Sequence, residues 1–237
     1  MIPRFLRDGW AYHERGGVWI TDLRPDEGPR LDRARLLAPG MELMELEEAR
    51  AGSGAELALA MGAGSSDEVA ARLGSGRRCF LVRAGGAIAA YGWVTAGGEW
   101  IGELDRRVEL AQDEAYIWDC ATLPAHRRRG LYKAVLAAML LTLSLEGYRR
   151  AWIGAALSNR PSVRAFSALG FRPVVMVDYR RLGAASCFYA TAFAGADPAS
   201  VTYARRALAA GAEHACGGVR LGWGLHRPGP ALGPPGR

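Results

Sequence analysis

The sequence of 237 residues has no apolar stretch long enough to cross a bilayer. Its longest apolar segment covers residues 134–141, whereas a membrane-spanning helix needs about 20 apolar residues. The first eight residues carry charges at positions where a secretory signal needs an apolar run. We therefore expect no export signal, no membrane partner and a cytoplasmic location.

Cysteine is scarce and shows no paired spacing. The chain has four cysteines, none of them in a CxxC pair or beside a cluster of histidines: Cys79, Cys120, Cys187 and Cys216. Disulfide frameworks and zinc sites are recognised by such pairs and clusters. We therefore expect reduced thiols and no metal.

Lysine is nearly absent, because Lys133 is the only one in the chain. The net charge of +6 is thus carried by arginine. Most of the arginines are scattered and have no accompanying aromatic platform, so we do not expect a nucleic-acid partner. The run Arg127–Arg129 differs because it stands directly before a glycine and a long apolar segment.

The length is sufficient for one substantial core with a small appendage. We divide the chain into an N-terminal extension at 1–40, with a strand at 17–23, a central domain at 41–183, and a C-terminal segment at 184–237. A helix is expected at 198–210. The end of the chain is too rich in proline and glycine to pack regularly, and we expect it to be disordered.

The first half of the central domain predicts strands and two short helices. A strand is expected at 41–47, helices at 55–61 and 66–73, and a hairpin formed by 79–83 and 88–95. The hairpin is indicated by two apolar runs separated by a turn with two glycines. A polar connection with one further strand near Val108 follows.

The second half predicts a strict alternation of strands and helices. The strands are expected at 116–123, 151–157 and 171–178, and the helices at 129–146 and 161–170. The first helix has apolar residues on more than one face, which is typical of a buried helix. This order indicates an α/β fold with helices packed on a mixed sheet.

The junction at 124–133 is suited to bind an anion. A strand ends at Pro124, a basic loop follows, and Gly130 opens a long helix. The first N–H groups of a helix have no partner within it, and the helix dipole is positive at this end. A glycine lets a phosphate approach the backbone closely. The pattern predicts a diphosphate site; the alternative is a solvated basic helix start with no ligand.

Neither common nucleotide motif is present, since the sequence lacks GxxxxGK[ST] and has no GxGxxG after a strand. The loop from Arg127 to Tyr132 instead resembles the (Gln/Arg)-x-x-Gly-x-(Gly/Ala) loop of the GNAT superfamily, although Tyr132 replaces its last small residue. Downstream, Asn159-Arg-Pro-Ser162 and Phe166-Ser-Ala-Leu-Gly-Phe171 resemble the next segments of that family in the same order.

The resemblance implies an acyl-coenzyme A-dependent N-acyltransferase in which two parallel strands splay apart around the coenzyme. The cosubstrate would be acetyl-coenzyme A or another acyl-coenzyme A. The splayed strands would be 116–123 and 151–157, with no metal involved. The residues implied to bind the cofactor are Ala121, Thr122, Leu123, Arg127, Arg128, Arg129, Gly130, Leu131, Tyr132, Lys133, Asn159, Ser162 and Phe166.

The same resemblance identifies the catalytic groups less completely than the cofactor-binding residues. Many members of the family have a tyrosine that acts as a general acid at the position of Phe166, and a phenylalanine cannot donate a proton. Tyr132 is our candidate acid, with water or a C-terminal tyrosine as alternatives. Asp119 is the candidate base; the alternative is an ion pair with an arginine. Asp113 and Glu114 are second choices, expected to be solvated charges at a strand end.

Several other residues near this site have expected roles. Cys120 has no adjacent histidine, so we expect an inert buried thiol. The N–H of Leu123 or Thr122 is implied to polarise the thioester carbonyl. Three tryptophans on or near these strands would line an acceptor pocket or, alternatively, pack in the core: Trp93, Trp100 and Trp118.

The expected function is transfer of an acetyl group, or another short acyl group, to a primary amine. The alternative is a coenzyme A-binding sensor or scaffold that has lost catalysis, which the phenylalanine at position 166 favours. The expected partners are the acyl-coenzyme A and the amine acceptor. A second copy of the chain, in a homodimer, is a further candidate partner.

Overall fold

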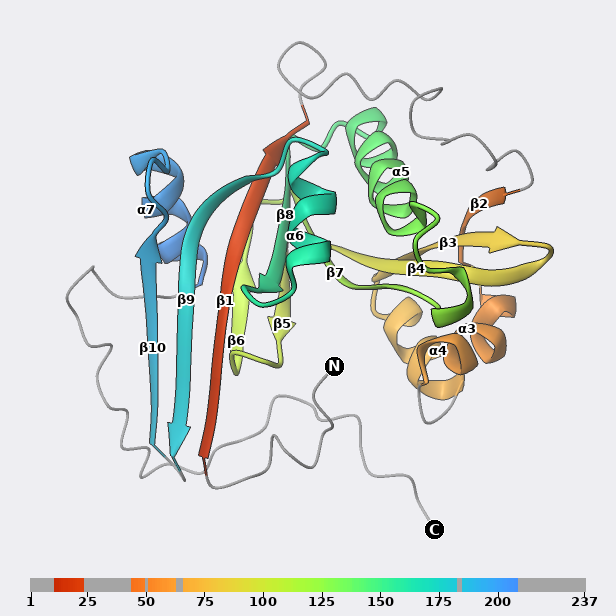
Figure 1. The fold of residues 1–237 in the computed structure, drawn as a ribbon, viewed down its shortest axis with the longest axis horizontal. Coiled ribbons are helices and arrows are strands. Elements are labelled where there is room, and N and C mark those ends of the chain that lie inside the picture. The colour runs from red at the N-terminus through yellow and green to blue at the C-terminus, as the bar shows by residue number, and fades with distance from the viewer. Residues whose placement is uncertain (1–10, 24–43, 50, 63–65, 183–184, 209–237) are drawn as a thin grey trace.

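The computed structural model describes residues 11–23, 44–49, 51–62, 66–182 and 185–208. Its centre is an eight-stranded sheet in the order β10-β9-β1-β8-β7-β4-β3-β2 (Figure 1). The strands of this sheet are β1 Ala11–Asp22, β2 Met44–Glu48, β3 Arg78–Ala84, β4 Ala87–Ala96, β7 Glu114–Thr122, β8 Arg150–Ala156, β9 Arg172–Leu182 and β10 Ala185–Ala192.

Helices cover both faces of this sheet. Buried side chains of α5 and α6 pack on one face, and those of α3, α4, α7 and a small β5–β6 hairpin pack on the other. The helices are α3 Gly54–Met61, α4 Ser66–Gly74, α5 Leu131–Leu145, α6 Arg160–Ser167 and α7 Pro198–Ala207, with 3-10 turns η1 Ala51–Ser53 and η2 Pro124–His126 and hairpin strands β5 Gly98–Ile101 and β6 Arg106–Glu109.

The predicted mixed α/β architecture is confirmed, most closely from β7 to β9. This part follows the expected order of strand, helix, strand, helix, strand. Helix α5 is the central buried helix that its sequence predicts, with eight fully buried side chains that include Val135, Met139 and Leu143. It packs against β3, β4 and β7. The helix therefore fixes the position of the loop that precedes it.

Strand β1 is longer than predicted and lies inside the sheet. The sequence predicts a strand at 17–23, whereas β1 covers Ala11–Asp22 and pairs antiparallel with β8 on one side and β9 on the other. Val18 and Ile20 face one core cluster, while Trp19 faces the other and packs on Phe166. Both strand partners lie more than 120 residues away along the chain, so local sequence does not reveal them.

The end of the described chain consists of β10 and α7. Strand β10 is an edge strand that the sequence analysis did not predict. Helix α7 matches the predicted helix as far as Ala207, and its N-cap Asp197 accepts a hydrogen bond from the Ser200 N–H. The expected disordered tail lies outside the described residues. Within the described part of the chain, no helix is both long and apolar enough to cross a membrane.

Acid should weaken the attachment of β1 to its neighbours. Asp22 pairs with Arg150 at 2.9 Å and with Arg172 at 2.5 Å. Burial acts to raise the pKa of Asp22, but both arginines outweigh it and hold the pKa below the ordinary 3.8. A lowered folded-state pKa stabilises the fold above 3.8, and this stabilisation is lost as the pH falls through the folded-state value.

We therefore expect Asp22→Asn to unfold at a lower temperature than the parent at pH 7. The difference between the two melting temperatures should shrink as the pH falls below 3.8. Thermal denaturation followed by circular dichroism between pH 2.5 and 7 measures both. A constant difference over this range would contradict the assignment.

Candidate active site

Strands β7 and β8 begin as a parallel pair and then part. Their ladder runs from Glu114 opposite Arg150 to Ile117 opposite Ile153. Both strands continue beyond this point, but the described residues form no further ladder between them. The predicted splaying of these two strands is thus present, and it leaves a gap bordered by backbone of residues 118–122 and 154–156.

A β-bulge lies where the strands begin to part. Trp118 pairs with Trp93 and Ala121 with Tyr91, so Asp119 and Cys120 together lie opposite one residue of β4, Gly92. A bulge bends its strand and increases its twist. We attribute the departure of β7 from β8 to this bend.

Gly92 leaves the space that the bulge needs. A Cβ at this position would lie 2.3 Å from the Met139 methyl carbon and 2.6 Å from the Cys120 sulfur. Real Cβ atoms do not approach other heavy atoms so closely. A larger residue at position 92 would push against both α5 and the bulge.

The end of β7 has one amide that faces the gap. The Leu123 N–H donates to the Ala89 carbonyl at 2.9 Å, so it is not free to polarise a thioester, and that part of the prediction is wrong. Backbone groups alternate between the two sides of a strand. The N–H of Thr122 therefore points away from β4, toward β8.

The loop before α5 has the geometry of an anion site. Helix α5 begins at Leu131, two residues later than predicted, because Gly130 is its N-cap with φ 77° and Arg128 has φ 65°. No side chain of the described residues caps this helix, so its first N–H groups are open to a ligand. Left-handed residues alternating with right-handed ones turn successive N–H groups toward one concavity.

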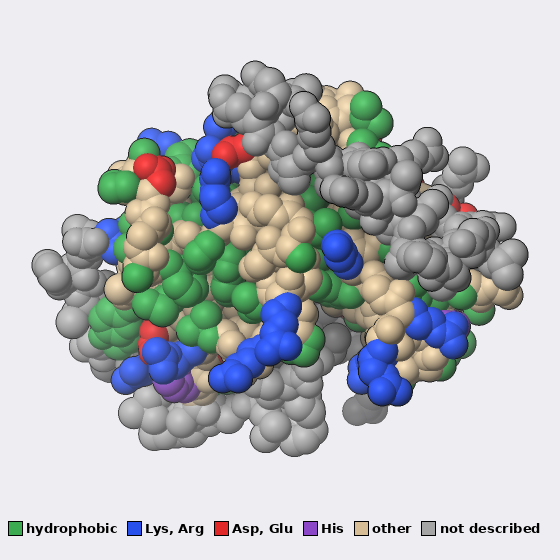
Figure 2. All heavy atoms as spheres, turned by 45° about the horizontal axis from the view of Figure 1, so that its top comes forward, with side chains coloured by type: hydrophobic (Ala, Val, Ile, Leu, Met, Phe, Trp, Pro, Cys, Tyr) green, Lys and Arg blue, Asp and Glu red, His purple; other side chains and the backbone are tan. Residues whose placement is uncertain are grey.

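Unpaired basic side chains surround this helix start. Most described arginines form ion pairs or hydrogen bonds with carboxylates, but six exposed residues near the start of α5 and on α6 have no ion-pair partner among the described residues. Figure 2 shows basic side chains at several places on one face of the molecule, with few acidic ones beside them. The six residues are Arg127, Arg128, Arg129, Lys133, Arg160 and Arg164.

Helix α6 borders the gap from the β8 side. Asn159 caps it and accepts a hydrogen bond from the Ser162 N–H at 3.4 Å. Phe166 is fully buried, with its ring 4.9 Å from that of Trp19 and 5.8 Å from that of Phe171. Its side chain is therefore part of the core, while Asn159 and Ser162 lie at the surface beside the strand end.

Tyr132 lies between the two sides of the gap. It is half-buried on the first turn of α5, and its hydroxyl interacts with Ser162 of α6 and lies near Cys120 of β7. Burial and the nearby thiol raise the pKa of Tyr132 well above the ordinary value, which the Ser162 interaction only partly offsets. The hydroxyl is therefore protonated at neutral pH, and burial makes it a weaker acid than a free tyrosine.

Asp119 forms the ion pair that was the alternative to a base. Its carboxylate accepts a hydrogen bond from Arg72 Nη1 at 2.6 Å. Arg72 belongs to α4 and was not singled out by the sequence, because nothing local links it to β7. Burial raises the pKa of the Cys120 thiol far above its ordinary value, which agrees with an inert cysteine.

The three tryptophans have different surroundings. Trp93 is completely buried and stacks on Trp118, with ring centroids 5.7 Å apart. Trp118 is half-buried and donates its indole N–H to Thr95 at 2.9 Å. Trp100 on the hairpin is 47% exposed. Trp93 is thus a core residue, whereas Trp118 lies on the sheet face beside the bulge.

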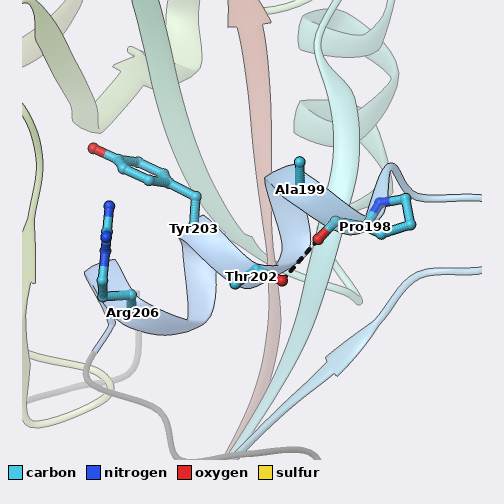
Figure 3. A pocket seen from close by; sticks show the side chains of 5 residues that line it. All are labelled: Pro198, Ala199, Thr202, Tyr203 and Arg206. Atoms are coloured by element: carbon cyan, nitrogen blue, oxygen red, sulfur yellow. Dashed lines mark hydrogen bonds between the residues drawn. The ribbon is translucent and has the colours of Figure 1, made fainter.

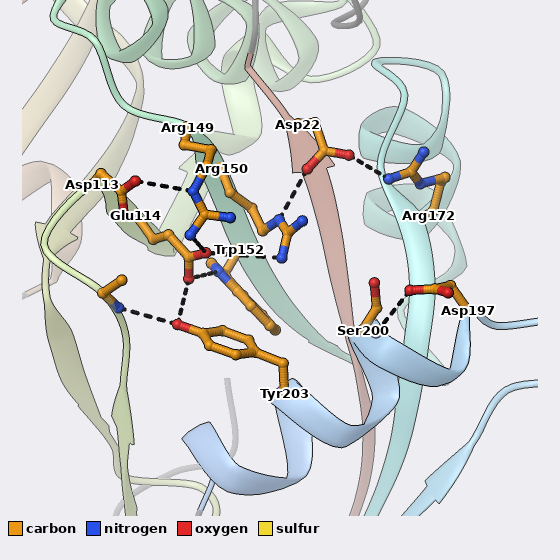
Figure 4. Close-up of polar contacts among 11 residues, drawn as sticks. Asp22, Asp113, Glu114, Arg149, Arg150, Trp152, Arg172, Asp197, Ser200 and Tyr203 are labelled. Atoms are coloured by element: carbon orange, nitrogen blue, oxygen red, sulfur yellow. Dashed lines mark hydrogen bonds and ion pairs between the residues drawn. The ribbon is translucent and has the colours of Figure 1, made fainter.

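Glu114 lies at the paired end of β7 and β8, opposite Arg150. It is fully buried, not solvated as predicted, and it accepts hydrogen bonds from Arg149 at 2.7 Å, from the Trp152 indole at 2.9 Å and from the Tyr203 hydroxyl at 2.9 Å (Figure 4). Three chain segments thereby meet at one carboxylate. Donating to Glu114 and burial both raise the pKa of Tyr203, burial being the larger effect.

A shallow pocket lies on α7, and it shares Tyr203 with the Glu114 cluster. Its described lining residues all belong to this helix, and none of the predicted site residues is among them (Figure 3). Its lining consists of Pro198, Ala199, Thr202, Tyr203 and Arg206. The described residues also contain no group of three or more histidine, cysteine or acidic side chains that could hold a metal ion.

Comparison with known families identifies the domain that contains this site. Residues 54–171 match the sequence model of the Acetyltransferase (GNAT) family. This segment is a GNAT acetyltransferase domain. The match runs from α3 to the residue before β9, so it contains the bulge, the gap and the open helix start. A comparison with curated protein sequences found no match.

The solved structures to which this chain is similar have low sequence identity to it. A fungal GH3 β-N-acetylglucosaminidase with a GCN5-related glucosamine N-acetyltransferase region has 14% identity and a TM-score of 0.54, over 74% of this chain and 21% of that chain. A GNAT-family protein from Novosphingobium aromaticivorans has 17% identity and a TM-score of 0.49, over 70% and 63%. The Escherichia coli ribosomal-protein-S18-alanine N-acetyltransferase has 19% identity and a TM-score of 0.44, over 54% and 77%.

This chain therefore spans less than two thirds of the length of the first two proteins.

Proposed function

We propose that this GNAT protein transfers an acyl group, in the first instance acetyl, from coenzyme A to a primary amine. The observation that carries the proposal is the adjacency of two sets of backbone groups that have no strand or helix partner among the described residues. The gap between β7 and β8 exposes strand backbone, and the uncapped start of α5 follows β7 after only a short turn. The pantetheine arm of coenzyme A is extended, contains amides and ends in a diphosphate. It therefore matches both the exposed strand backbone and the start of α5.

The diphosphate would be held by amides of Arg128 to Lys133, with Gly130 allowing its close approach. The charges of Arg127, Arg128 and Arg129 would draw the polyanion to the site. The pantetheine arm would pair with the backbone of Thr122 on one side, since Ala121 directs its backbone groups toward Tyr91 of β4, and it would reach Asn159 on the other side. The Nδ1 atom of His126 is buried without a hydrogen-bond partner among the described residues, which makes it a further group available to the cofactor near this loop.

The reaction would be a direct attack by the neutral amine on the thioester carbonyl. The Thr122 N–H, aimed into the gap, would donate to the carbonyl oxygen as negative charge develops on it. The nitrogen then loses a proton to solvent water, the carbon–sulfur bond breaks, and the departing thiolate takes up a proton. Tyr132 is the proposed donor of this proton, because its hydroxyl lies at the gap and keeps its proton. It would replace the tyrosine that many family members have where this chain has Phe166.

The direct test is release of free coenzyme A from acetyl-coenzyme A in the presence of a panel of amines. The panel should contain small primary amines, amino sugars, peptides with a free N-terminus and peptides with lysine. Amine-dependent thiol release supports the proposal. Saturable binding of coenzyme A without release for any amine would favour the alternative, a sensor or scaffold without catalysis.

We expect Tyr132→Phe to lower kcat by roughly 10- to 100-fold with little change in the dissociation constant of coenzyme A, since general acids contribute on the order of 100-fold or more. The phenyl ring keeps the packing of Tyr132 against the core. Steady-state kinetics and calorimetric titration measure the two quantities. A kcat equal to that of the parent would assign the proton to water instead.

A further inference from the structure

Arg72 connects helix α4 to the bulge of β7. Its Nη1 atom lies 2.6 Å from the Asp119 carboxylate and its Nη2 atom 3.2 Å from that of Glu68, one turn earlier on the same helix. The side chains of Arg72 and Asp119 are only 18% and 20% exposed. One guanidinium thus joins a carboxylate of the helix to a carboxylate of the strand.

Two tryptophans fix the orientation of this guanidinium. Its central carbon lies 5.2 Å from the ring centroid of Trp93 and 5.0 Å from that of Trp118. Cations are attracted to the faces of such rings, and a planar guanidinium also stacks on them in a way that an ammonium cannot. Because Trp93 is completely buried, it gives the Arg72 guanidinium a rigid surface to stack on.

Asp119 has a backbone conformation that needs such support. Its φ is 43°, in the left-handed region that residues other than glycine rarely adopt. Strained residues of this kind persist where surrounding contacts hold them. Among the described residues, Arg72 provides the one hydrogen bond and ion pair of the Asp119 side chain.

We infer that Arg72 is a positioning residue for the proposed acyl transfer. By holding the Asp119 carboxylate, it keeps Asp119 left-handed, which preserves the bulge, the departure of β7 from β8 and the direction of the Thr122 N–H. Asp119 then acts through its backbone and not as a base. The inference rests on the proposed function, and it concerns a residue of α4 that touches none of the reacting groups.

Variants at the two positions separate this role from a catalytic one. Arg72→Leu should lower kcat on the order of 100-fold, since misplacing one oxyanion donor has an effect of this size, and it should weaken binding of coenzyme A by a smaller factor, because the diphosphate site at the start of α5 stays intact. Asp119→Gly should lower kcat by only about threefold, because glycine adopts φ 43° without strain. Arg72→Lys should lie between Arg72→Leu and the parent.

The double variant Arg72→Leu/Asp119→Gly gives the sharpest result. If Arg72 acts by holding the left-handed conformation, glycine removes the need for it, and kcat should recover at least about tenfold relative to Arg72→Leu. A purely structural role in docking α4 predicts no recovery, and a lower melting temperature for both variants that contain Arg72→Leu. Loss of activity in Asp119→Gly as large as in Arg72→Leu would overturn the inference and restore Asp119 as the base.

Hydrogen exchange keeps this test distinct from that of the proposed function. If the parent releases no thiol with any amine, the proposed acyl transfer has failed. The positioning claim is then judged from backbone exchange in a peptide covering residues 117–123. Faster exchange in Arg72→Leu and its reversal in the double variant would support the claim, whereas equal exchange in all three proteins would contradict it.

Discussion

Replacing Gly130 with valine should weaken binding of coenzyme A on the order of 100-fold or more. Gly130 has φ 77° and provides the N-cap of α5. Valine disfavours this conformation strongly, because its branched side chain clashes with the backbone there. The loop must then change its shape, and the amides of Arg128 to Lys133 no longer converge. A loss of about 2.7 kcal/mol of binding free energy corresponds to this factor.

Gly147 offers a matched control for this variant. It lies just beyond the other end of the same helix, has φ 87°, and a Cβ there would meet no atom of the described residues within 4 Å. Gly147→Val should therefore lower stability by a similar amount and leave the dissociation constant within about twofold, since strain alone does not affect a remote anion site. Calorimetric titration of both variants with coenzyme A makes the comparison. Equal weakening by both would mean that the loop before α5 does not bind the diphosphate.

Removing the carboxylate of Glu114 should be the most destabilising single change at the paired end of the gap. Glu114→Ala leaves Arg149, the Trp152 indole and the Tyr203 hydroxyl without their shared acceptor. Breaking a buried ion pair by removing one partner costs about 3–5 kcal/mol. For a domain of this size we expect the melting temperature to fall on the order of 10 °C.

Asp113 is the matched control for this second prediction. It also pairs with Arg149, at 2.9 Å, but its side chain is 51% exposed. Asp113→Ala should therefore cost less than about 1 kcal/mol, the usual limit for exposed ion pairs. Chemical denaturation of both variants gives the two free energies of unfolding. A loss for Asp113→Ala equal to that for Glu114→Ala would show that burial of the carboxylate does not determine the effect.

The sequence predicts the α/β core well where structure depends on neighbouring residues. The alternation from β7 to β9 and the burial of α5 follow from periodic apolar residues. The start of α5 was predicted two residues early, since apolar periodicity does not register the left-handed conformations of Arg128 and Gly130. Strand β1 was predicted too short because its pairing with β8 and β9 depends on residues far along the chain.

The backbone of the site is more predictable than its side chains. The proline, basic loop and glycine before α5 predict the open helix start, and a family resemblance anchored on short motifs implies the splaying of β7 from β8. The burial of Glu114 does not follow from the sequence, because its partners come from residue 149 and from helix α7. The sequence leaves the role of Asp119 open for a similar reason: the arginine that binds it lies 47 residues earlier, on α4.

Hydrogen–deuterium exchange of the parent protein with and without saturating coenzyme A tests whether the cofactor lies between β7 and β8. We expect slower exchange in two segments, residues 118–123 at the gap and residues 128–134 at the helix start, and unchanged exchange in β10 and α7. Slower exchange in both segments would locate the cofactor in this gap. No change in either segment, or protection confined to the shallow pocket on α7, would show that coenzyme A does not bind there.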